Sequence, residues 1–209
     1  MAAPYSPEGF RQRAKARLAG QDRREYGDHS FNPGLEDYFS KIKRQPAAVL
    51  VPVIAHEPEV TVLLTERTHD LASHPGQIAF PGGKVDAGDD SVEAAALREA
   101  EEEIGLPQRH VSVLGRAPDY LTGSGFNIAP VLGLVAPGAQ LTLNPGEVAD
   151  AFEVPLSFLM NPANHHRGRR IWQGVERTYF EMPYRDRYIW GVTAGILRVL
   201  YEQLYGDGL

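Results

Sequence analysis

The 209-residue chain has no cysteine, no long apolar run and no excess of positive charge. The absence of cysteine excludes disulfide bonds, thiolate metal sites and a cysteine nucleophile. No apolar run approaches the ~20 residues of a membrane helix, and no secretory apolar region follows Met1. We therefore expect a cytoplasmic protein with no membrane partner. The formal net charge of −6 also argues against a nucleic-acid partner.

The composition that remains is that of a folded globular chain. Hydrophobic residues make up 43% and charged residues 23%, and the length favours a single domain. Glycine and proline, with 21 and 16 residues, together exceed the usual share of ~12%. They indicate many shaped loops, which often carry binding and catalytic residues. An anionic small substrate is compatible with the charge if local arginines or metal ions receive it.

Hydrophobic periodicity predicts strands that alternate with helices. The predicted strands cover residues 47–55, 60–67, 77–80, 111–116, 128–135, 147–154, 169–173 and 177–182, the last two forming a hairpin across Gly174. Predicted helices cover 91–104 and about 188–204, with a helical turn at 155–160. Pro52 predicts an edge position or a bulge for the first strand. This alternation predicts an α/β layer arrangement with a mixed sheet.

The N-terminal segment predicts a helix within residues 6–20, followed by an irregular stretch at 27–46. Phe10, Ala14 and Leu18 share one face of that helix. Its arginine-rich remainder permits two interpretations, a helix packed on the domain or an organelle presequence. Acidic residues in and after the segment favour the packed helix.

The most acidic segment is residues 99–103, Glu-Ala-Glu-Glu-Glu, in the predicted helix 91–104. At ~100° per residue, Glu99, Glu102 and Glu103 share one face, whereas Glu101 points away. The last turns of a helix disfavour negative charge. Two carboxylates ~6 Å apart repel by roughly 3 kcal/mol at an effective dielectric constant of about 20. Arg98, one turn before Glu102, is predicted to pair with it but cannot balance all three.

Carboxylates crowded in this way have three alternatives: they have raised pKa values, they are exposed to water, or they bind cations. Oxygen ligands favour hard ions such as Mg²⁺ or Mn²⁺. The strand before the helix ends in Phe-Pro-Gly-Gly, and Gly82 and Gly83 allow the backbone to approach a ligand closely. Asp90 and Glu93 predict a capping box at the start of the helix, and Gly105 predicts its end.

Residues 83–106 resemble the Nudix box, a glycine, a loop with an acid, and a helix that reads Arg-Glu-apolar-x-Glu-Glu-x-Gly-apolar. The matching residues are Arg98, Glu99, Ala100, Glu102, Glu103, Gly105 and Leu106. The loop is one residue longer than in the usual box, and Asp89 or Asp90 stands in place of the early glutamate. The resemblance implies a Nudix-type α/β/α sandwich with a mixed β-sheet at residues 47–209. Residues 1–46 would be an N-terminal helix and irregular extension.

The resemblance also implies a metal-dependent pyrophosphohydrolase acting on a nucleoside diphosphate derivative. Glu99 and Glu103 would be the principal ligands of Mg²⁺ or Mn²⁺, assisted by Glu102 and the Gly82 carbonyl. Arg98 would orient the glutamates. Metal ions would neutralise the pyrophosphate, polarise the P–O bond and deprotonate the attacking water. A homodimer is a further possibility, because dimers are common in the family.

The segment 63–83 resembles the signature of the coenzyme A pyrophosphatase subfamily. The matching residues are Leu63, Leu64, Thr65, Arg67, Gly76 and Phe80 to Gly83. Ala72 stands where the signature has an arginine. The resemblance implies cleavage of coenzyme A and its derivatives to 3′,5′-ADP and 4′-phosphopantetheine. ADP-ribose or NADH as the substrate, and a non-catalytic nucleotide-binding module, are the alternatives.

Several other candidate residues carry two interpretations each. Arg67 and His74 bind substrate phosphate, or else Arg67 pairs with a carboxylate and His74 caps a turn. Gly82 and Gly83 join this substrate-binding set through their backbone. Glu147 assists as a base or metal ligand, or is a solvated turn acid. The basic run 165–170 receives a phosphate or forms a solvated hairpin end.

Overall fold

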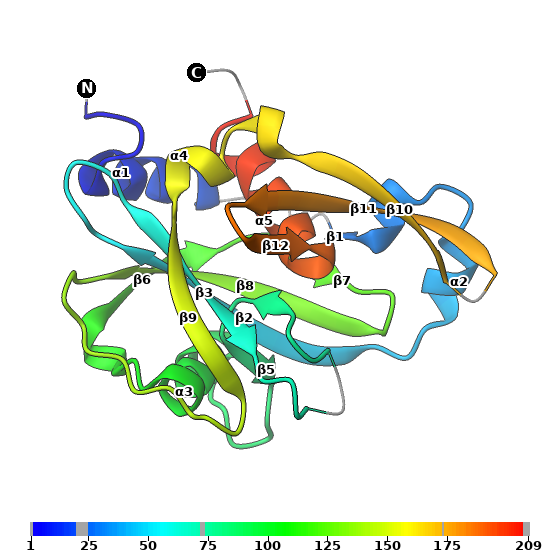
Figure 1. The fold of residues 1–209 in the computed structure, drawn as a ribbon, viewed down its shortest axis with the longest axis horizontal. Helices are drawn as coiled ribbons and strands as arrows, with labels where there is room; N and C mark the ends of the chain where they lie inside the picture. Colours follow the sequence, from blue (N-terminus) through cyan, green and yellow to red (C-terminus); the bar gives the residue numbers. More distant parts are fainter. Residues whose placement is uncertain (1, 20–24, 72–73, 173, 207–209) are drawn as a thin grey trace.

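The computed structural model describes residues 2–19, 25–71, 74–172 and 174–206 (Figure 1). The helices are α1 (Pro7–Leu18), α2 (Glu36–Lys41), α3 (Val92–Ile104), α4 (Leu156–Leu159) and α5 (Gly191–Leu204), with short 3₁₀ helices at Asp28–Phe31, Gln108–His110 and Pro162–Asn164. The strands are β1 (Tyr26–Gly27), β2 (Gln45–Ile54), β3 (Thr61–Arg67), β4 (Ile78–Ala79), β5 (Gly82–Lys84), β6 (Val111–Arg116), β7 (Tyr120–Leu121), β8 (Phe126–Val135), β9 (Val148–Pro155), β10 (His166–Trp172), β11 (Val175–Tyr184) and β12 (Arg187–Trp190).

A mixed sheet of nine strands forms the centre of the molecule. Its main path is β1-β7-β8-β2-β3-β4, with β5 paired to β2, β6 to β8 and β9 to β3. The long strands β2 and β8 are parallel, whereas β3 is antiparallel to both β2 and β9. Strands β10, β11 and β12 form a second, antiparallel sheet.

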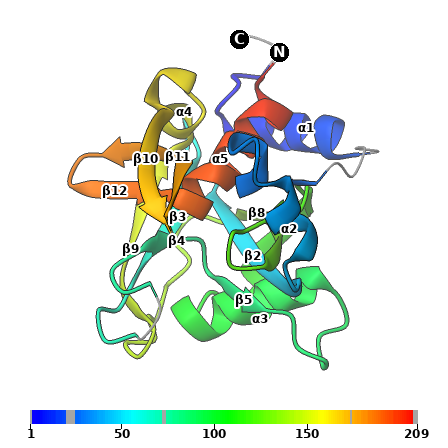
Figure 2. The same ribbon diagram turned by 90° about the vertical axis from the view of Figure 1, so that its right-hand side faces the viewer.

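Helices cover both faces of the central sheet, with α3 on one face and α1 and α5 on the other (Figures 1 and 2). Alternation along β2 gives each face its own core. Ala48 and Leu50 pack in the cluster that contains α3, and Val51 and Val53 pack in the cluster that contains α5. Ala100, fully buried on α3, lets that helix approach the sheet closely. The predicted α/β/α sandwich with a mixed sheet is confirmed.

The edge or bulge prediction for Pro52 is wrong, because β2 lies inside the sheet. Pro52 pairs with Gly133 of β8 in an unbroken parallel register. On the other side of β2, Leu50 donates its N–H to the Pro81 carbonyl, and pairing with β3 begins at Val53. Pro52 faces this same side, because backbone direction alternates along a strand. Its missing N–H therefore falls where β2 changes partner, and no ladder bond is lost.

Local chemistry sets both ends of α3, but not with the residue predicted at its start. Ser91, rather than Asp90, is the N-cap, and its Oγ accepts the Ala94 N–H at 3.1 Å. Gly105 ends the helix as predicted, with a left-handed φ of 64° and an N–H that bonds back to the last turn. The acidic face consequently stops at the C-terminal end of α3.

The N-terminal region is more ordered than expected. Phe10 and Ala14 of α1 are buried, as the packed-helix interpretation predicts. The stretch 27–46 is not irregular throughout, because it contains α2 and the start of β2, and the adjacent β1 pairs with β7. These elements are stabilised by distant partners, which local periodicity does not report. The domain boundary at residue 47 stays a prediction.

Two other element boundaries differ from prediction. The C-terminal helix begins at Gly191 rather than near 188, because Arg187–Trp190 pairs with β11. The predicted strand 77–80 is reduced to Ile78–Ala79, and the expected glycine loop contributes β5 to the sheet. The hairpin across Gly174 is confirmed, with longer arms than predicted. Among the described residues, no helix combines the length and the apolar character that a membrane crossing requires.

Candidate active site

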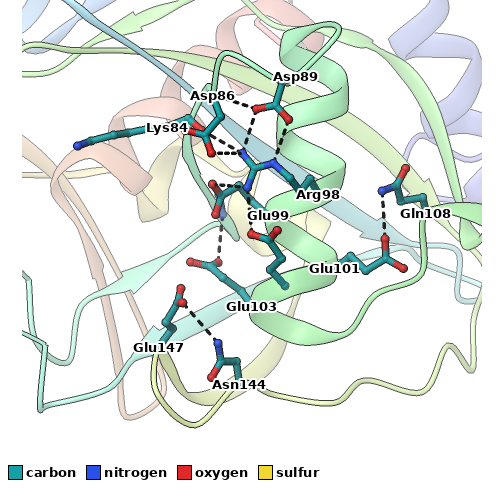
Figure 3. A network of polar contacts seen from close by, with 12 residues as sticks. Lys84, Asp86, Asp89, Arg98, Glu99, Glu101, Glu103, Gln108, Asn144 and Glu147 are labelled. Carbon is teal, nitrogen blue, oxygen red and sulfur yellow. Dashed lines mark hydrogen bonds and ion pairs between the residues drawn. The ribbon is translucent and has the colours of Figure 1, made fainter.

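Arg98 organises the acidic face of α3 (Figure 3). Its Nε and Nη2 donate to the two carboxylate oxygens of Asp89 at 2.9 and 3.0 Å. Its Nη1 donates to Glu99 and Glu102, both at 3.0 Å, so the predicted pairing with Glu102 is present. These bonds lower the pKa of Asp89 and raise that of Arg98 itself. One guanidinium thus fixes three carboxylates of the segment.

Glu103 is the most deeply buried of the predicted acidic residues. It is 4% exposed and accepts the Gly82 N–H at 3.1 Å. Burial raises the pKa of Glu103 to about 7, the Gly82 bond opposes this rise, and the Glu147 and Glu99 carboxylates add to it. Burial also raises the pKa of Glu99, against the effect of Arg98. Glu101 points away, as predicted, and accepts from Gln108 at 3.0 Å (Figure 3).

A loop before β9 brings Glu147 to this face of α3. The Asn144 N–H donates to the Glu103 carbonyl at 2.9 Å, and the Thr142 N–H donates to the Ile104 carbonyl at 2.9 Å. Both bonds satisfy carbonyl groups at the end of α3 that have no hydrogen-bond partner within the helix. The Asn144 side chain then faces the Glu147 carboxylate at 3.4 Å (Figure 3). Sequence reasoning missed Asn144, although the turn sequence Asn-Pro-Gly before Glu147 was a signal for it.

Glycines of β5 let the backbone lie directly against these carboxylates. A Cβ at Gly83 would stand 2.5 Å from Glu99 Oε1, so any larger residue would displace that carboxylate. A Cβ at Gly82 would stand 2.4 Å from the Ala48 carbonyl oxygen of β2. The two glycines are therefore needed for different reasons. The missing side chain leaves room for the Glu99 carboxylate at Gly83 and for the backbone of β2 at Gly82.

Arg67 reaches the same region from the end of β3. Its positive charge lowers the pKa of Glu103. The Arg67 Nε is buried and has no hydrogen-bond partner among the described residues. Its neighbour Thr68 donates its N–H to the Glu147 carbonyl at 3.0 Å, which ties this strand end to the Glu147 loop. None of the ion pairs within 4.0 Å that the described residues form includes Arg67.

His74 is not part of this acidic cluster. It is exposed, has a left-handed φ of 57°, and lines a separate cavity of about 470 Å³. This cavity, called here the arginine cavity, also contains Arg170 and Arg177. The Gln77 N–H bonds to the His74 carbonyl at 3.3 Å, so the residue does belong to a turn. Ala72, the departure from the subfamily signature, lies outside the described residues.

The acidic residues fit a divalent metal ion by their donor chemistry. Among the described residues, no three His, Asp or Glu side chains are close enough to form a preassembled metal site. Electrostatic repulsion nevertheless acts among these carboxylates. The Glu147 charge raises the pKa of both Glu99 and Glu103, and the Glu99 charge also raises the pKa of Glu103. A cation would relieve this repulsion, and all-oxygen donors suit a hard ion.

Known proteins resemble this chain over most of its length. A family model described as the NUDIX domain matches residues 43–172. A Photorhabdus laumondii protein named uncharacterized Nudix hydrolase NudL is 43% identical over 158 residues, which are 76% of this chain and 84% of that protein. Its namesake from Yersinia pestis is 41% identical over 167 residues, covering 80% and 83%. A solved structure, the Nudix hydrolase RenU from M. Smegmatis, is 25% identical with a TM-score of 0.47, covering 55% and 73%.

The family match covers more than half of the chain and contains β2, β5, α3 and the Glu147 loop. Nudix hydrolases generally use divalent metal ions and act on small molecules that contain a nucleoside diphosphate. The match, the identity to the two relatives and the α/β/α architecture agree. This chain belongs to the Nudix hydrolase family.

Proposed function

We propose that this Nudix hydrolase cleaves coenzyme A and its derivatives to 3′,5′-ADP and 4′-phosphopantetheine. The observation that carries the proposal is the coenzyme A signature at residues 63–83, because this segment leads from β3 through β4 into β5, and β5 packs against α3. Its Gly83 lies directly against the Glu99 carboxylate, and the charge of its Arg67 lowers the pKa of Glu103. The same segment therefore carries the substrate signature and supports the reacting centre.

We assign Glu99 and Glu103 as the principal ligands of Mg²⁺ or Mn²⁺, with Glu102 and the Gly82 carbonyl assisting. A bound ion would neutralise the pyrophosphate and lower the pKa of the attacking water. Arg98 holds Glu99 and Glu102 by charge-assisted bonds and so positions the ligands rather than contacting the substrate.

Arg67 and Glu147 have the remaining roles at the reacting centre. Arg67 receives a phosphate oxygen, because its buried Nε has no partner among the described residues. Glu147, held on a loop beside α3, accepts the proton of the attacking water at a carboxylate oxygen. The water oxygen bonds to one phosphorus while the bridging P–O bond breaks, and the leaving phosphate takes the electron pair. The two products are then phosphomonoesters.

A substrate panel tests this function. Coenzyme A, 3′-dephospho-coenzyme A, ADP-ribose and NADH are each incubated with the protein and Mg²⁺ or Mn²⁺, and kcat/KM is obtained from product chromatography. We expect coenzyme A to exceed ADP-ribose and NADH by at least about tenfold. Faster cleavage of ADP-ribose or NADH would replace the substrate assignment. Equal, background-level rates for wild type and Glu103→Gln would indicate a binding module instead.

A further inference from the structure

The arginine cavity is built where the second sheet meets the start of α5 and the turn between β7 and β8. Its volume is about 470 Å³, within the range of small-molecule sites. Its walls come from segments far apart in sequence, including 74–77, 122–124 and 190–193. None of Glu99, Glu102, Glu103 or Glu147 lines it. It is thus distinct from the acidic face of α3.

The register of the second sheet places four large side chains on the cavity side. Arg170 pairs directly with Arg177, and Trp190 pairs with Glu181. Paired residues and residues two apart share a face, so Arg170, Arg177, Tyr179 and Trp190 lie on one face. All four line the cavity, and the Tyr179 and Trp190 rings are 5.4 Å apart. A pair of guanidiniums is consequently presented beside two aromatic rings.

Two like charges placed directly across a strand pair destabilise it. The carboxylate in the cavity wall is Asp28, which accepts from Tyr120 Oη at 2.8 Å and from the Gly123 N–H at 2.7 Å. Burial raises the pKa of Asp28, whereas these two hydrogen bonds and the Arg177 charge oppose that rise. Even a fully charged Asp28 offsets only one of the two guanidiniums in the cavity wall. The cavity therefore favours an anionic ligand.

The start of α5 adds to this preference. Gly191, Val192 and Thr193 form its first turn and line the cavity, and Trp190 provides no side-chain cap. The positive end of the helix dipole therefore lies in the cavity wall. The Thr193 hydroxyl donates to the Ile78 carbonyl of β4 at 2.9 Å, which fixes this turn to the central sheet.

The short chain segment from β4 to β5 connects the cavity to the acidic site. Gln77, in the cavity wall, stands five positions before Gly82, the hydrogen-bond donor to Glu103. Five residues span at most about 18 Å. One elongated substrate is long enough to occupy both places.

We propose that the arginine cavity binds a substrate phosphate that lies outside the reacting pyrophosphate and is carried on the ribose of the nucleoside. Arg170 and Arg177 contact that phosphate, and Tyr179 and Trp190 pack against the nucleoside. The proposal rests on the proposed function for the identity of the substrate, and on the cavity itself for the class of ligand. Arg170 is the last residue of the basic run 165–170. The proposal therefore gives this hairpin a role in substrate specificity.

Direct binding tests the cavity without any hydrolysis. Adenosine 3′,5′-bisphosphate and AMP differ only in the ribose 3′-phosphate, and their dissociation constants are measured by calorimetry with Mg²⁺ present. Wild type should bind the bisphosphate at least about tenfold more tightly than AMP, as expected for a charge-assisted phosphate contact. Arg170→Gln should remove most of this preference. Arg170 is the position to change, because Arg177 also lies 4.9 Å from the Tyr38 ring.

Arg169→Gln is the matched control. Arg169 belongs to the same hairpin, carries the same charge, pairs only loosely with Glu176 at 3.6 Å and does not line the cavity. This variant should keep the preference for the bisphosphate. Equal losses in the two variants, or no preference in wild type, would overturn the cavity proposal.

Kinetics separate this proposal from the proposed function. Arg170→Gln should raise KM for coenzyme A about tenfold, with kcat within about twofold and little change for 3′-dephospho-coenzyme A. A cavity that binds the bisphosphate through Arg170 in a protein that cleaves no coenzyme A would refute only the proposed substrate. Cleavage of coenzyme A that is unaffected in Arg170→Gln would refute only the cavity.

Discussion

The acidic face of α3 and the arginine cavity are opposite in charge and are built in opposite ways. Nearly all of the acidic site comes from one continuous segment, from Gly82 to Glu103, with the Glu147 loop added. The cavity comes from at least five separated segments that only the fold brings together. The net charge of −6 is therefore a sum that includes two sites of opposite local charge. The acidic face of α3 repels anions unless it binds a cation, whereas the arginine cavity attracts them.

The largest expected effect separates catalysis from binding. Glu103→Gln should lower kcat by at least about a hundredfold, because it removes a charged ligand at the buried centre of the acidic site. It should leave the binding of adenosine 3′,5′-bisphosphate in the cavity unchanged. Steady-state kinetics and calorimetry on the same preparation measure both quantities.

Glu101→Gln is the control for this comparison, because Glu101 lies on the same helix but bonds only to Gln108. Its activity should match wild type. Activity of Glu103→Gln within about tenfold of wild type would exclude Glu103 from the metal site.

Arg98→Lys should have the next largest effect. Lysine keeps the charge but lacks the planar fork that bonds Asp89 through two nitrogens. We expect kcat/KM to fall about ten- to a hundredfold, and the free energy of unfolding to fall by about 1–3 kcal/mol. Urea denaturation and kinetics measure the two changes. Arg109→Lys, at an exposed position just after α3, should change neither, and an Arg98→Lys variant that behaved the same way would show that Arg98 does not position the glutamates.

The two glycines of β5 should differ in what they disturb. Gly83→Ala places a methyl group against the Glu99 carboxylate, a flexible side-chain end, so activity should fall about tenfold with less than about 1 kcal/mol lost in stability. Gly82→Ala meets the backbone of β2 and should cost about 1–3 kcal/mol. Thermal melts and initial rates distinguish them. Gly88→Ala, with no atom within 4 Å of the added Cβ, is the neutral control.

The last expected effect concerns stability with metal. An ion that binds only the folded state adds about 2.7 kcal/mol at a hundredfold excess over its Kd, which is about 5 to 10 °C in Tm. Glu99→Gln should lose most of this shift yet be close to wild type in EDTA, because burial and the neighbouring Glu102 and Glu147 already disfavour its charge. Melting curves in EDTA and in millimolar Mg²⁺ measure the shift. Equal shifts in wild type, Glu99→Gln and Glu101→Gln would place the ion elsewhere.

Much of the acidic site could be predicted because its geometry is local. A helix of 3.6 residues per turn puts Glu99, Glu102 and Glu103 on one face whatever surrounds it. The pairing of Arg98 with Glu102 follows from the same spacing. Pro52 was misjudged for the converse reason, since a strand's place in a sheet depends on partners distant in sequence.

The layered α/β class, the Nudix box and the glutamate face of α3 could all be recognised without the structure. Each of these depends on residues a few positions apart, whose relation is set by helix and strand geometry. The packing of distant segments decided that Asn144 brings Glu147 to α3, that Arg67 acts electrostatically on Glu103, and that His74 lines a cavity containing neither. The tertiary structure likewise placed Arg170 and Arg177 in one cavity, because contacts between separated segments depend on how the whole chain packs.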